Sequence, residues 1–212
     1  MKNGDTLRMA GHGLAAANGP SPLPELVVIG CSRGGLSALT KVLSALPADF
    51  PAAVLVVQHL SADFESRLAE ILGQRTSLKV QQARHGVRVE RGVVYIAPPD
   101  QHLTLSRFGR IQLDRGREVN FSRPAVDSLF RSAATHFGEH VTAVLLSGFG
   151  HDGAAGAAAI HKAGGVVIVE SEASARDFGM ASAAIETGSV SHIMAANQIP
   201  SFLQHRLTVV ND

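Results

Sequence analysis

Three polar side chains with the chemistry of a serine hydrolase stand just behind apolar runs of the chain. They are Ser32 in the glycine-rich turn 30–35, His59 past the apolar run 53–57, and Asp152 in segment 147–153, after the apolar run 141–146. A serine hydroxyl becomes a nucleophile when an imidazole takes its proton, and a carboxylate orients that imidazole. Continuous apolar runs are typical of buried parallel strands, whose carboxyl ends meet at one edge of a sheet. The pattern therefore predicts that these three residues converge on one cleft.

Each residue has a distinct role in this hypothesis. His59 is the general base, because an imidazole with an ordinary pKa of about 6.5 can take a proton near neutral pH. Asp152 holds the tautomer of His59 and stabilises the imidazolium. The oxyanion of the tetrahedral intermediate needs preorganised donors. The backbone N–H groups of Arg33 and Phe149 are placed by the sequence to supply them.

The turn 30–35 has other interpretations. Gly30 and Gly35 have the spacing of the outer glycines of a dinucleotide-binding fingerprint, but Ser32 replaces the central glycine. The acidic residue expected about 20 residues later is also missing. Alternatively, Gly30 only lets the chain turn sharply, and Asp152 is only the N-cap of the next helix. A non-catalytic signalling module with the same fold is a further class of function.

For two other groups of reactive side chains we expect a structural role and no part in catalysis. Cys31 precedes Ser32 and could itself be a nucleophile, but a small cysteine beside an apolar run is usually buried packing. His136 and His140 are four residues apart yet lack the glutamate of the H-E-x-x-H zinc motif, so we expect both on an exposed helix. No metal site is predicted.

The composition argues against several classes of protein. Lys plus Arg number 19 against 18 for Asp plus Glu, so no net charge attracts nucleic acid or a membrane surface. Aromatic residues make up 5% and tryptophan is absent, which disfavours a base-stacking surface. No apolar run approaches the roughly 18 residues of a membrane helix, and the N-terminus lacks a signal-peptide apolar region. We expect a soluble cytoplasmic protein without direct membrane insertion.

Apolar runs alternate with segments of helical periodicity along most of the chain. Strands are expected at 26–30, 53–57, 78–82, 93–97, 141–146, 166–169 and 190–194. Helices are expected around 36–46, 64–72, 124–137 and 152–163, and a hairpin joins 103–105 to 111–113. Pro124 is expected in the first turn of the third helix. This alternation predicts an α/β fold: a doubly wound, mostly parallel sheet with helices on both faces and a short antiparallel hairpin insertion. Residues 1–24 are interpreted as a flexible N-terminal tail and 25–212 as one catalytic domain.

Six blocks of the sequence also match a known family. The chain resembles the catalytic domain of chemotaxis protein-glutamate methylesterases from about Leu26 to Leu203. The matching blocks are 28–35 (VIGCSRGG), 56–60 (VVQHL), 94–103 (VYIAPPDQHL), 123–130 (RPAVDSLF), 147–153 (SGFGHDG) and 172–180, with EAS and FGM at its ends. Each block is short, but six in order make a specific signal.

The resemblance implies that Ser32, His59 and Asp152 form a catalytic triad in that chain order and that the backbone of Phe149 is an oxyanion donor. Such enzymes hydrolyse γ-glutamyl methyl esters on the cytoplasmic helices of chemoreceptors, and some deamidate receptor glutamines. No metal or organic cofactor is expected. The family's usual form carries a phosphorylatable receiver domain ahead of the esterase. Only a short tail precedes Leu26 here, so we expect no in-chain phosphorylation control.

Overall fold

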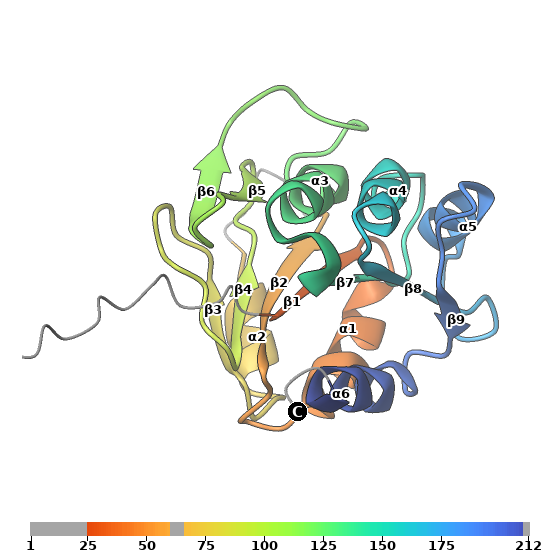
Figure 1. Ribbon diagram of the computed structural model, residues 1–212, viewed down its shortest axis with the longest axis horizontal. Helices are drawn as coiled ribbons and strands as arrows, with labels where there is room; N and C mark the ends of the chain where they lie inside the picture. The colour runs from red at the N-terminus through yellow and green to blue at the C-terminus, as the bar shows by residue number, and fades with distance from the viewer. Residues whose placement is uncertain (1–24, 60–65, 210–212) are drawn as a thin grey trace, which may run out of the picture.

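A seven-stranded parallel sheet forms the centre of the protein (Figure 1). The structure is a computed structural model that describes residues 25–59 and 66–209. The strands lie in the order β3-β4-β2-β1-β7-β8-β9. Their bounds are β1 Glu25–Cys31, β2 Ala52–Gln58, β3 Lys79–Gln82, β4 Val93–Ile96, β7 Val141–Leu145, β8 Val166–Glu170 and β9 His192–Met194. The prediction of a mostly parallel α/β sheet is confirmed.

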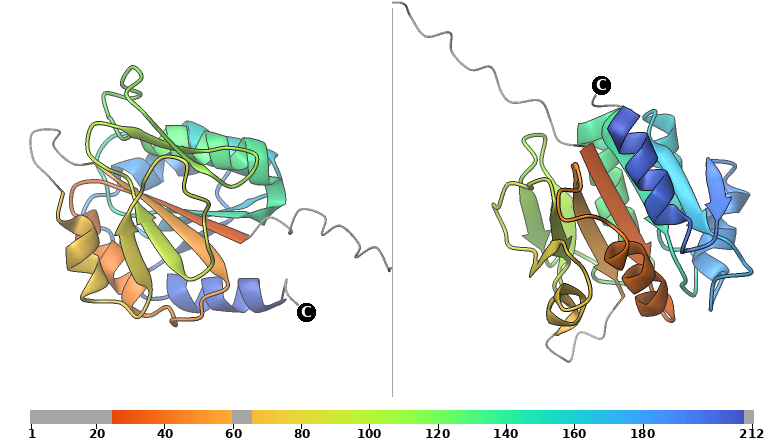
Figure 2. Two further views of the ribbon diagram at one scale, coloured as in Figure 1. Left: turned by 90° about the vertical axis from the view of Figure 1, so that its left-hand side faces the viewer. Right: turned by 90° about the horizontal axis from the view of Figure 1, so that it is seen from below.

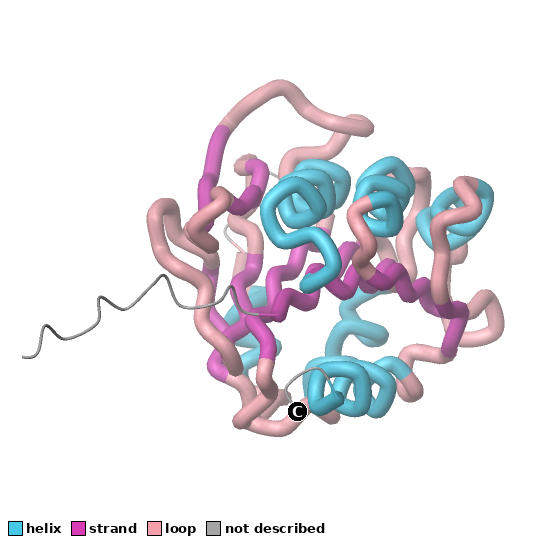
Figure 3. Tube along the Cα trace, viewed as in Figure 1, coloured by secondary structure: helices cyan, strands magenta, loops and turns pink. Residues whose placement is uncertain are grey.

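Helices cover both faces of this sheet, as Figures 1 and 3 show. One face carries α3 Val126–Phe137, α4 Ala154–Lys162 and α5 Gly179–Glu186. The other carries α1 Gly35–Ser44, α2 Leu68–Gly73 and α6 Ile199–Val209. The left view of Figure 2 shows the same two layers from the side, and the right view looks from below onto the face that carries α1, α2 and α6. The arrangement is the predicted doubly wound fold, and none of the described helices is long and apolar enough to cross a membrane.

The two helical layers enclose two separate cores. Because side chains alternate along a strand, Val28 and Leu55 pack into the core under α3, whereas Val27 and Val54 pack into the core above α1. Both faces of the central strands are therefore buried, and every residue of β1 is buried. This explains why the central strands appear in the sequence as continuous apolar runs.

The predicted hairpin lies outside the main sheet. It is formed by β5 His102–Leu105 and β6 Ile111–Asp114, which pair antiparallel. The backbone N–H of Leu105 donates to Oγ of Ser132 on α3, which ties the hairpin to that helix. The short antiparallel insertion is thus confirmed.

The structure corrects three local predictions. Helix α3 begins at Val126, so Pro124 precedes the helix rather than lying in its first turn. His140 lies outside α3, in a 3₁₀ turn Gly138–His140, because Gly138 ends the helix with a φ of 55°. Helices α5 and α6 were not predicted at all. Helix α5 consists mainly of small residues, so its sequence shows only a weak apolar stripe.

Two predictions fall outside the described residues. The flexible tail 1–24 is one, and the start of the second predicted helix at Phe64 is the other. Within the described part of the chain that helix is α2.

The strand order reverses at β1, and this fixes where a site can form. Strand β1 pairs with β2 on one side and with β7 on the other, in a register that sets Cys31 opposite Gln58 and Gly30 opposite Leu145. The carboxyl ends of these three strands therefore lie at one level of the sheet. In open α/β sheets ligands bind at such a point, outside the carboxyl ends of the strands.

Candidate active site

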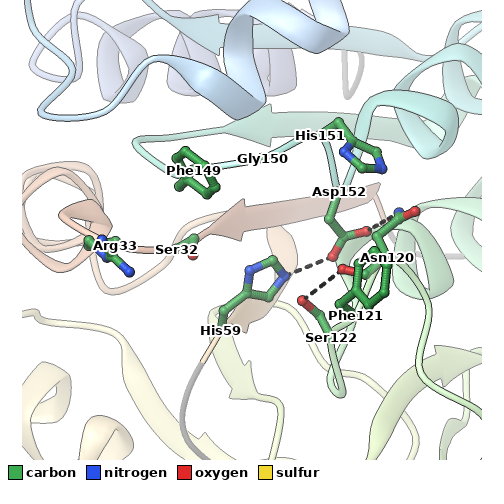
Figure 4. Close-up of a pocket in the computed structure, with 10 residues that line it drawn as sticks. All are labelled: Ser32, Arg33, His59, Asn120, Phe121, Ser122, Phe149, Gly150, His151 and Asp152. Atoms are coloured by element: carbon green, nitrogen blue, oxygen red, sulfur yellow. Dashed lines mark hydrogen bonds and ion pairs between the residues drawn. The ribbon is translucent and has the colours of Figure 1, made fainter.

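The three residues predicted to do chemistry lie together beyond β1, β2 and β7. A pocket of about 320 Å³ opens there (Figure 4), and its walls come from four segments of the chain. It is lined by Ser32, Arg33, His59, Asn120, Phe121, Ser122, Phe149, Gly150, His151 and Asp152. The structure thus brings all five residues proposed from the sequence to one pocket.

The turn after β1 presents Ser32 at the start of helix α1. The backbone N–H of Ser32 donates to the carbonyl of Ser147, at 3.0 Å, which ties the turn to the end of β7. The carbonyl of Ser32 in turn accepts from the N–H of Gly35, the first residue of α1. Gly34 between them has a φ of 83°, a left-handed conformation that glycine adopts without steric cost. Ser32 is half-buried, so its hydroxyl reaches the pocket from a fixed backbone.

Two glycines permit the close packing around this turn. A Cβ atom at Gly148 would lie 2.1 Å from Sδ of Met180 and 3.0 Å from Cβ of Ser32. A Cβ atom at Gly30 would lie 2.4 Å from Cγ1 of Val126. Gly30 is a residue of β1, so its predicted part in a sharp turn is wrong. It is small because helix α3 packs directly against the strand.

His59 is held between Asp152 and Ser32. Its Nε2 lies 2.8 Å from Oδ2 of Asp152, and its backbone N–H donates to the carbonyl of Cys31. Figure 4 shows the imidazole between the two side chains, with Nδ1 on the side of Ser32. No hydrogen bond joins Oγ of Ser32 to His59 within the described residues. Catalytic hydrogen bonds are often long in the absence of substrate and tighten when it binds.

The carboxylate of Asp152 is buried and accepts four hydrogen bonds. Oδ2 accepts from His59 and from the N–H of Val126, and Oδ1 accepts from the N–H of Asp127 and from the side-chain amide of Asn120. Burial by itself would raise the pKa of this carboxyl. The hydrogen bonds from His59, Asp127, Asn120 and Val126 outweigh that effect and hold the pKa below its ordinary value.

These contacts correct the interpretation of Asp152 as a helix cap. The carboxylate does cap a helix, but that helix is α3: it accepts hydrogen bonds from the first two N–H groups of α3. Its own helix, α4, begins after Gly153 and is capped by Asp127: Oδ1 of Asp127 accepts from the N–H groups of Gly153 and Gly156. The side chain of Asp152 therefore both caps α3 and orients His59.

Asp127 and Asn120 are site residues that the sequence reasoning missed. The side-chain amide of Asn120 donates to Oδ2 of Asp127, at 2.9 Å, and to Oδ1 of Asp152, at 3.0 Å. Asn120 has a φ of 51°, a left-handed conformation that asparagine tolerates better than most residues. Asp127 was visible as an acidic residue near a helix start, but nothing in the sequence pairs it with a helix 26 residues away.

The backbone N–H groups of Arg33 and Phe149 are available to a ligand. Neither donates to a protein acceptor in the described part of the chain, and both residues line the pocket. Behind them, the buried carboxylate of Glu170 accepts from the N–H and the Oγ of Ser147. This fixes the end of β7, from which the segment carrying Phe149 continues.

Cys31 and the histidine pair take no part in this site. Cys31 is fully buried, and burial, with a smaller contribution from the charge of Glu170, raises the pKa of its thiol to about 12. Nδ1 of His140 lies 2.8 Å from the carboxylate of Glu25, and His140 is outside the helix that carries His136. In the described ranges no three His, Cys, Asp or Glu side chains are grouped so that they could hold a metal ion.

Fold and site together define a doubly wound α/β protein with a serine, a histidine and an aspartate at the carboxyl ends of three adjacent parallel strands, the arrangement typical of serine hydrolases. The chain belongs to the CheB methylesterase family, whose sequence model matches residues 27–203. The resemblance noted from the six sequence blocks is therefore confirmed.

Individual relatives agree with this assignment. The chain is 44% identical over 180 residues to "Protein-glutamate methylesterase/protein-glutamine glutaminase 2" of Anaeromyxobacter dehalogenans, covering 85% of this chain and 52% of the relative. It is 42% identical over 178 residues to the corresponding protein of Salmonella typhimurium, covering 82% and 51%. The chain thus spans about half the length of the curated relatives it matches. The crystal structure of the Thermotoga maritima CheB methylesterase catalytic domain is 38% identical, with a TM-score of 0.82, covering 86% of this chain and 98% of that one.

Proposed function

We propose that this protein is a protein-glutamate methylesterase in which Ser32 is the nucleophile, His59 the general base and Asp152 the residue that orients the base. The observation that carries the proposal is the 2.8 Å contact between Nε2 of His59 and Asp152, with Nδ1 on the side of Ser32. An Nε2–H that donates to a carboxylate leaves Nδ1 unprotonated, so Nδ1 can accept the serine proton. The family assignment supports the same reaction.

The reaction proceeds in two acyl transfers. Oγ of Ser32 attacks the carbonyl carbon of the methyl ester while Nδ1 of His59 takes the hydroxyl proton. The tetrahedral intermediate collapses, its bond to the methoxy oxygen breaks, and His59 returns the proton so that methanol leaves. Water then attacks the glutamyl-serine ester, again giving its proton to His59. Collapse of the second intermediate restores Ser32 and releases the glutamate side chain.

Charge is stabilised at two places during these steps. The N–H groups of Arg33 and Phe149 donate to the oxyanion, because they have no competing protein acceptor among the described residues. Asp152 stabilises the imidazolium on the opposite side of the ring. Its lowered pKa keeps it ionised at neutral pH, and three donors other than His59 keep its carboxylate in place.

The substrate we propose is a methylated glutamate on a cytoplasmic helix of a chemoreceptor, and the protein would act in the cytoplasm. A second reaction, deamidation of glutamine, follows from the same steps with ammonia as the leaving group. The names of the relatives favour it, because they include protein-glutamine glutaminase.

A nucleotide-binding role is disfavoured by the turn itself. The N–H groups of Ser32 and Gly35 already donate to protein carbonyls, so they cannot cradle a pyrophosphate without breaking those bonds. A Cβ-sized atom added to Gly35 would lie 2.6 Å from Cβ of Cys31 and 2.8 Å from the carbonyl oxygen of Ser147, so this glycine serves internal packing.

The test is methanol release from receptor membranes carrying labelled methyl esters. Ser32→Ala should lower the rate at least about 10³-fold, because loss of a triad nucleophile has costs of this order or more. Ser37→Ala is the matched control, since Ser37 is exposed on α1 and five residues from the nucleophile. If both variants release methanol as fast as the parent, Ser32 is not the nucleophile. If the parent releases none while binding the receptor, the protein is a non-catalytic module.

A further inference from the structure

Two exposed phenylalanines form part of the pocket wall. Four large apolar side chains are exposed among the described residues, and two of them, Phe121 at 93% and Phe149 at 71%, line the pocket that holds Ser32. Figure 4 shows Phe149 on the Ser32 side of the site and Phe121 on the Asp152 side. The two phenyl rings therefore lie on different sides of the catalytic groups.

Phe121 is held there in an unfavourable backbone conformation. It lies with Asn120 at the tip of a two-residue turn, closed by hydrogen bonds in both directions between the backbones of Val119 and Ser122. The φ values of 51° for Asn120 and 59° for Phe121 are those of a type I′ turn, in which glycine is strongly preferred at the second position. A bulky residue with positive φ is an outlier, and such outliers cluster at functional sites.

The turn cannot relax away from the site, because Asn120 anchors it. The side-chain amide of Asn120 donates to the buried carboxylates of Asp127 and Asp152. Phe121 is therefore fixed beside the catalytic groups with its ring almost wholly in solvent. Burial in the core does not account for this side chain, since only a small part of it is covered.

We propose that the side chains of Phe121 and Phe149 form a substrate-binding rim. It binds apolar side chains that flank the esterified glutamate on an amphipathic helix of the protein substrate. Residues three and four positions apart lie on the same face of a helix, so a helix that presents one glutamate to Ser32 presents such neighbours to the rim. The proposal rests on the methylesterase function proposed above, and it identifies these two side chains as determinants of protein-substrate specificity.

The experiment uses two synthetic helical peptides, each with one γ-methyl glutamate. In one, the residues three and four positions away on both sides are leucines; in the other they are glutamines, which have similar helix propensity. The measured quantity is the preference, the ratio of kcat/KM for the leucine peptide to that for the glutamine peptide. We expect a preference of about tenfold in the parent, because burying even part of an apolar side chain is worth this factor.

A set of variants distinguishes a substrate-binding role of the two phenylalanines from a purely structural one. Phe121→Gly and Phe149→Ser should each cut the preference to about twofold or less, whereas Phe121→Tyr should keep it. The matched control is Phe108→Ala, which removes a phenyl ring that is 60% exposed and lies in the turn between β5 and β6. This control should keep the preference. Because glycine relieves the left-handed strain, Phe121→Gly should raise Tm by about 2–4 °C rather than lower it.

Three outcomes would overturn the proposal. They are a parent without preference, a Phe121→Gly variant with unchanged preference, and a fall in the Tm of Phe121→Gly with equal loss of activity on both peptides. Failure of the proposed function looks different. In that case the parent releases methanol from neither peptide. Binding of both peptides to Ser32→Ala, with and without Phe121→Gly, then still tests the rim through the ratio of their Kd values measured by fluorescence anisotropy.

Discussion

Asp127 and Asp152 cap each other's helices. Asp152, which directly precedes the N-cap of α4, accepts hydrogen bonds from the first two N–H groups of α3. Asp127, which lies within α3, accepts hydrogen bonds from two N–H groups at the start of α4. Asn120 bridges the two carboxylates through one amide nitrogen. The positive ends of two helix dipoles therefore face a pair of buried carboxylates. The orientation of His59 is thus tied to the packing of α3 against α4.

Removing the Asn120 amide that bridges Asp127 and Asp152 should lower the stability of the protein by an amount that depends on pH. In Asn120→Gly the left-handed φ of 51° is retained without strain, but both carboxylates lose a donor. The pKa of Asp152 is lowered in the folded protein, so its contribution is present above the unfolded-state pKa and is lost as pH falls through the folded pKa. The variant should be about 1–3 kcal/mol less stable at pH 7, and the difference should shrink by pH 3.

Urea unfolding at both pH values measures this difference. Asn197→Gly is the matched control, because Asn197 is exposed and has no side-chain hydrogen bond in the described part of the chain. It should change stability by the same small amount at both pH values. A deficit in Asn120→Gly that stays constant from pH 7 to pH 3 would contradict the role of Asn120 in holding the ionised carboxylate of Asp152.

Asp127→Ala should destabilise the fold more than any exposed aspartate would. It leaves the buried N–H groups of Gly153 and Gly156 without their acceptor, and the amide of Asn120 keeps only Asp152 of its two acceptors. Losing a cap costs about 1 kcal/mol and each unpaired buried donor about 1–3, so we expect a loss of about 2–5 kcal/mol. Thermal and urea unfolding measure it against Asp49→Ala, an exposed position. A loss within 0.5 kcal/mol, the usual range for surface changes, would show that α4 does not need this cap.

Much of the fold was predictable because central strands and amphipathic helices leave periodic signals. Val27 and Val28 point to opposite cores, so β1 is a continuous apolar run after Glu25, and α3 repeats apolar residues at helical spacing. Helix α5 leaves almost no such signal, because alanines and Gly179 pack at close range: Gly179 lies beside the backbone of Gly148 and Gly150. Its existence depends on contacts between segments distant in sequence.

In the candidate site, too, some residues were predictable from the sequence and others were not. Ser32, His59 and Asp152 could be proposed because each lies in the segment that follows an apolar run, and the carboxyl ends of parallel strands meet. Asn120 and Phe121 follow no strand of the main sheet, and they reach the pocket only because the turn 119–122 folds over it. Their place depends on long-range packing that no local pattern encodes.

Cys31 should be unreactive although it neighbours the nucleophile. Its pKa of about 12 against an ordinary 9.0 lowers the thiolate fraction at pH 8 by nearly a factor of 10³. Burial also blocks access to its sulfur. Iodoacetamide labelling of the native protein, followed by mass spectrometry, should be at least about 10²-fold slower than labelling in urea. Labelling at equal rates in both conditions would restore Cys31 as a candidate nucleophile.

Gly148→Ala should lower kcat by displacing Ser32. The new Cβ would lie 2.1 Å from Sδ of Met180 and 3.0 Å from Cβ of Ser32, so at least one of these side chains must move. A displacement of about 1 Å at the reacting atoms can cost about 10²-fold in rate, whereas the flexible Met180 side chain can absorb part of the clash. Gly73→Ala is the matched control, because its Cβ would meet only Cβ of Val80, at 3.8 Å. Methanol release at saturating substrate measures kcat, and a kcat equal to that of Gly73→Ala would mean that Met180 alone moves and Ser32 keeps its position.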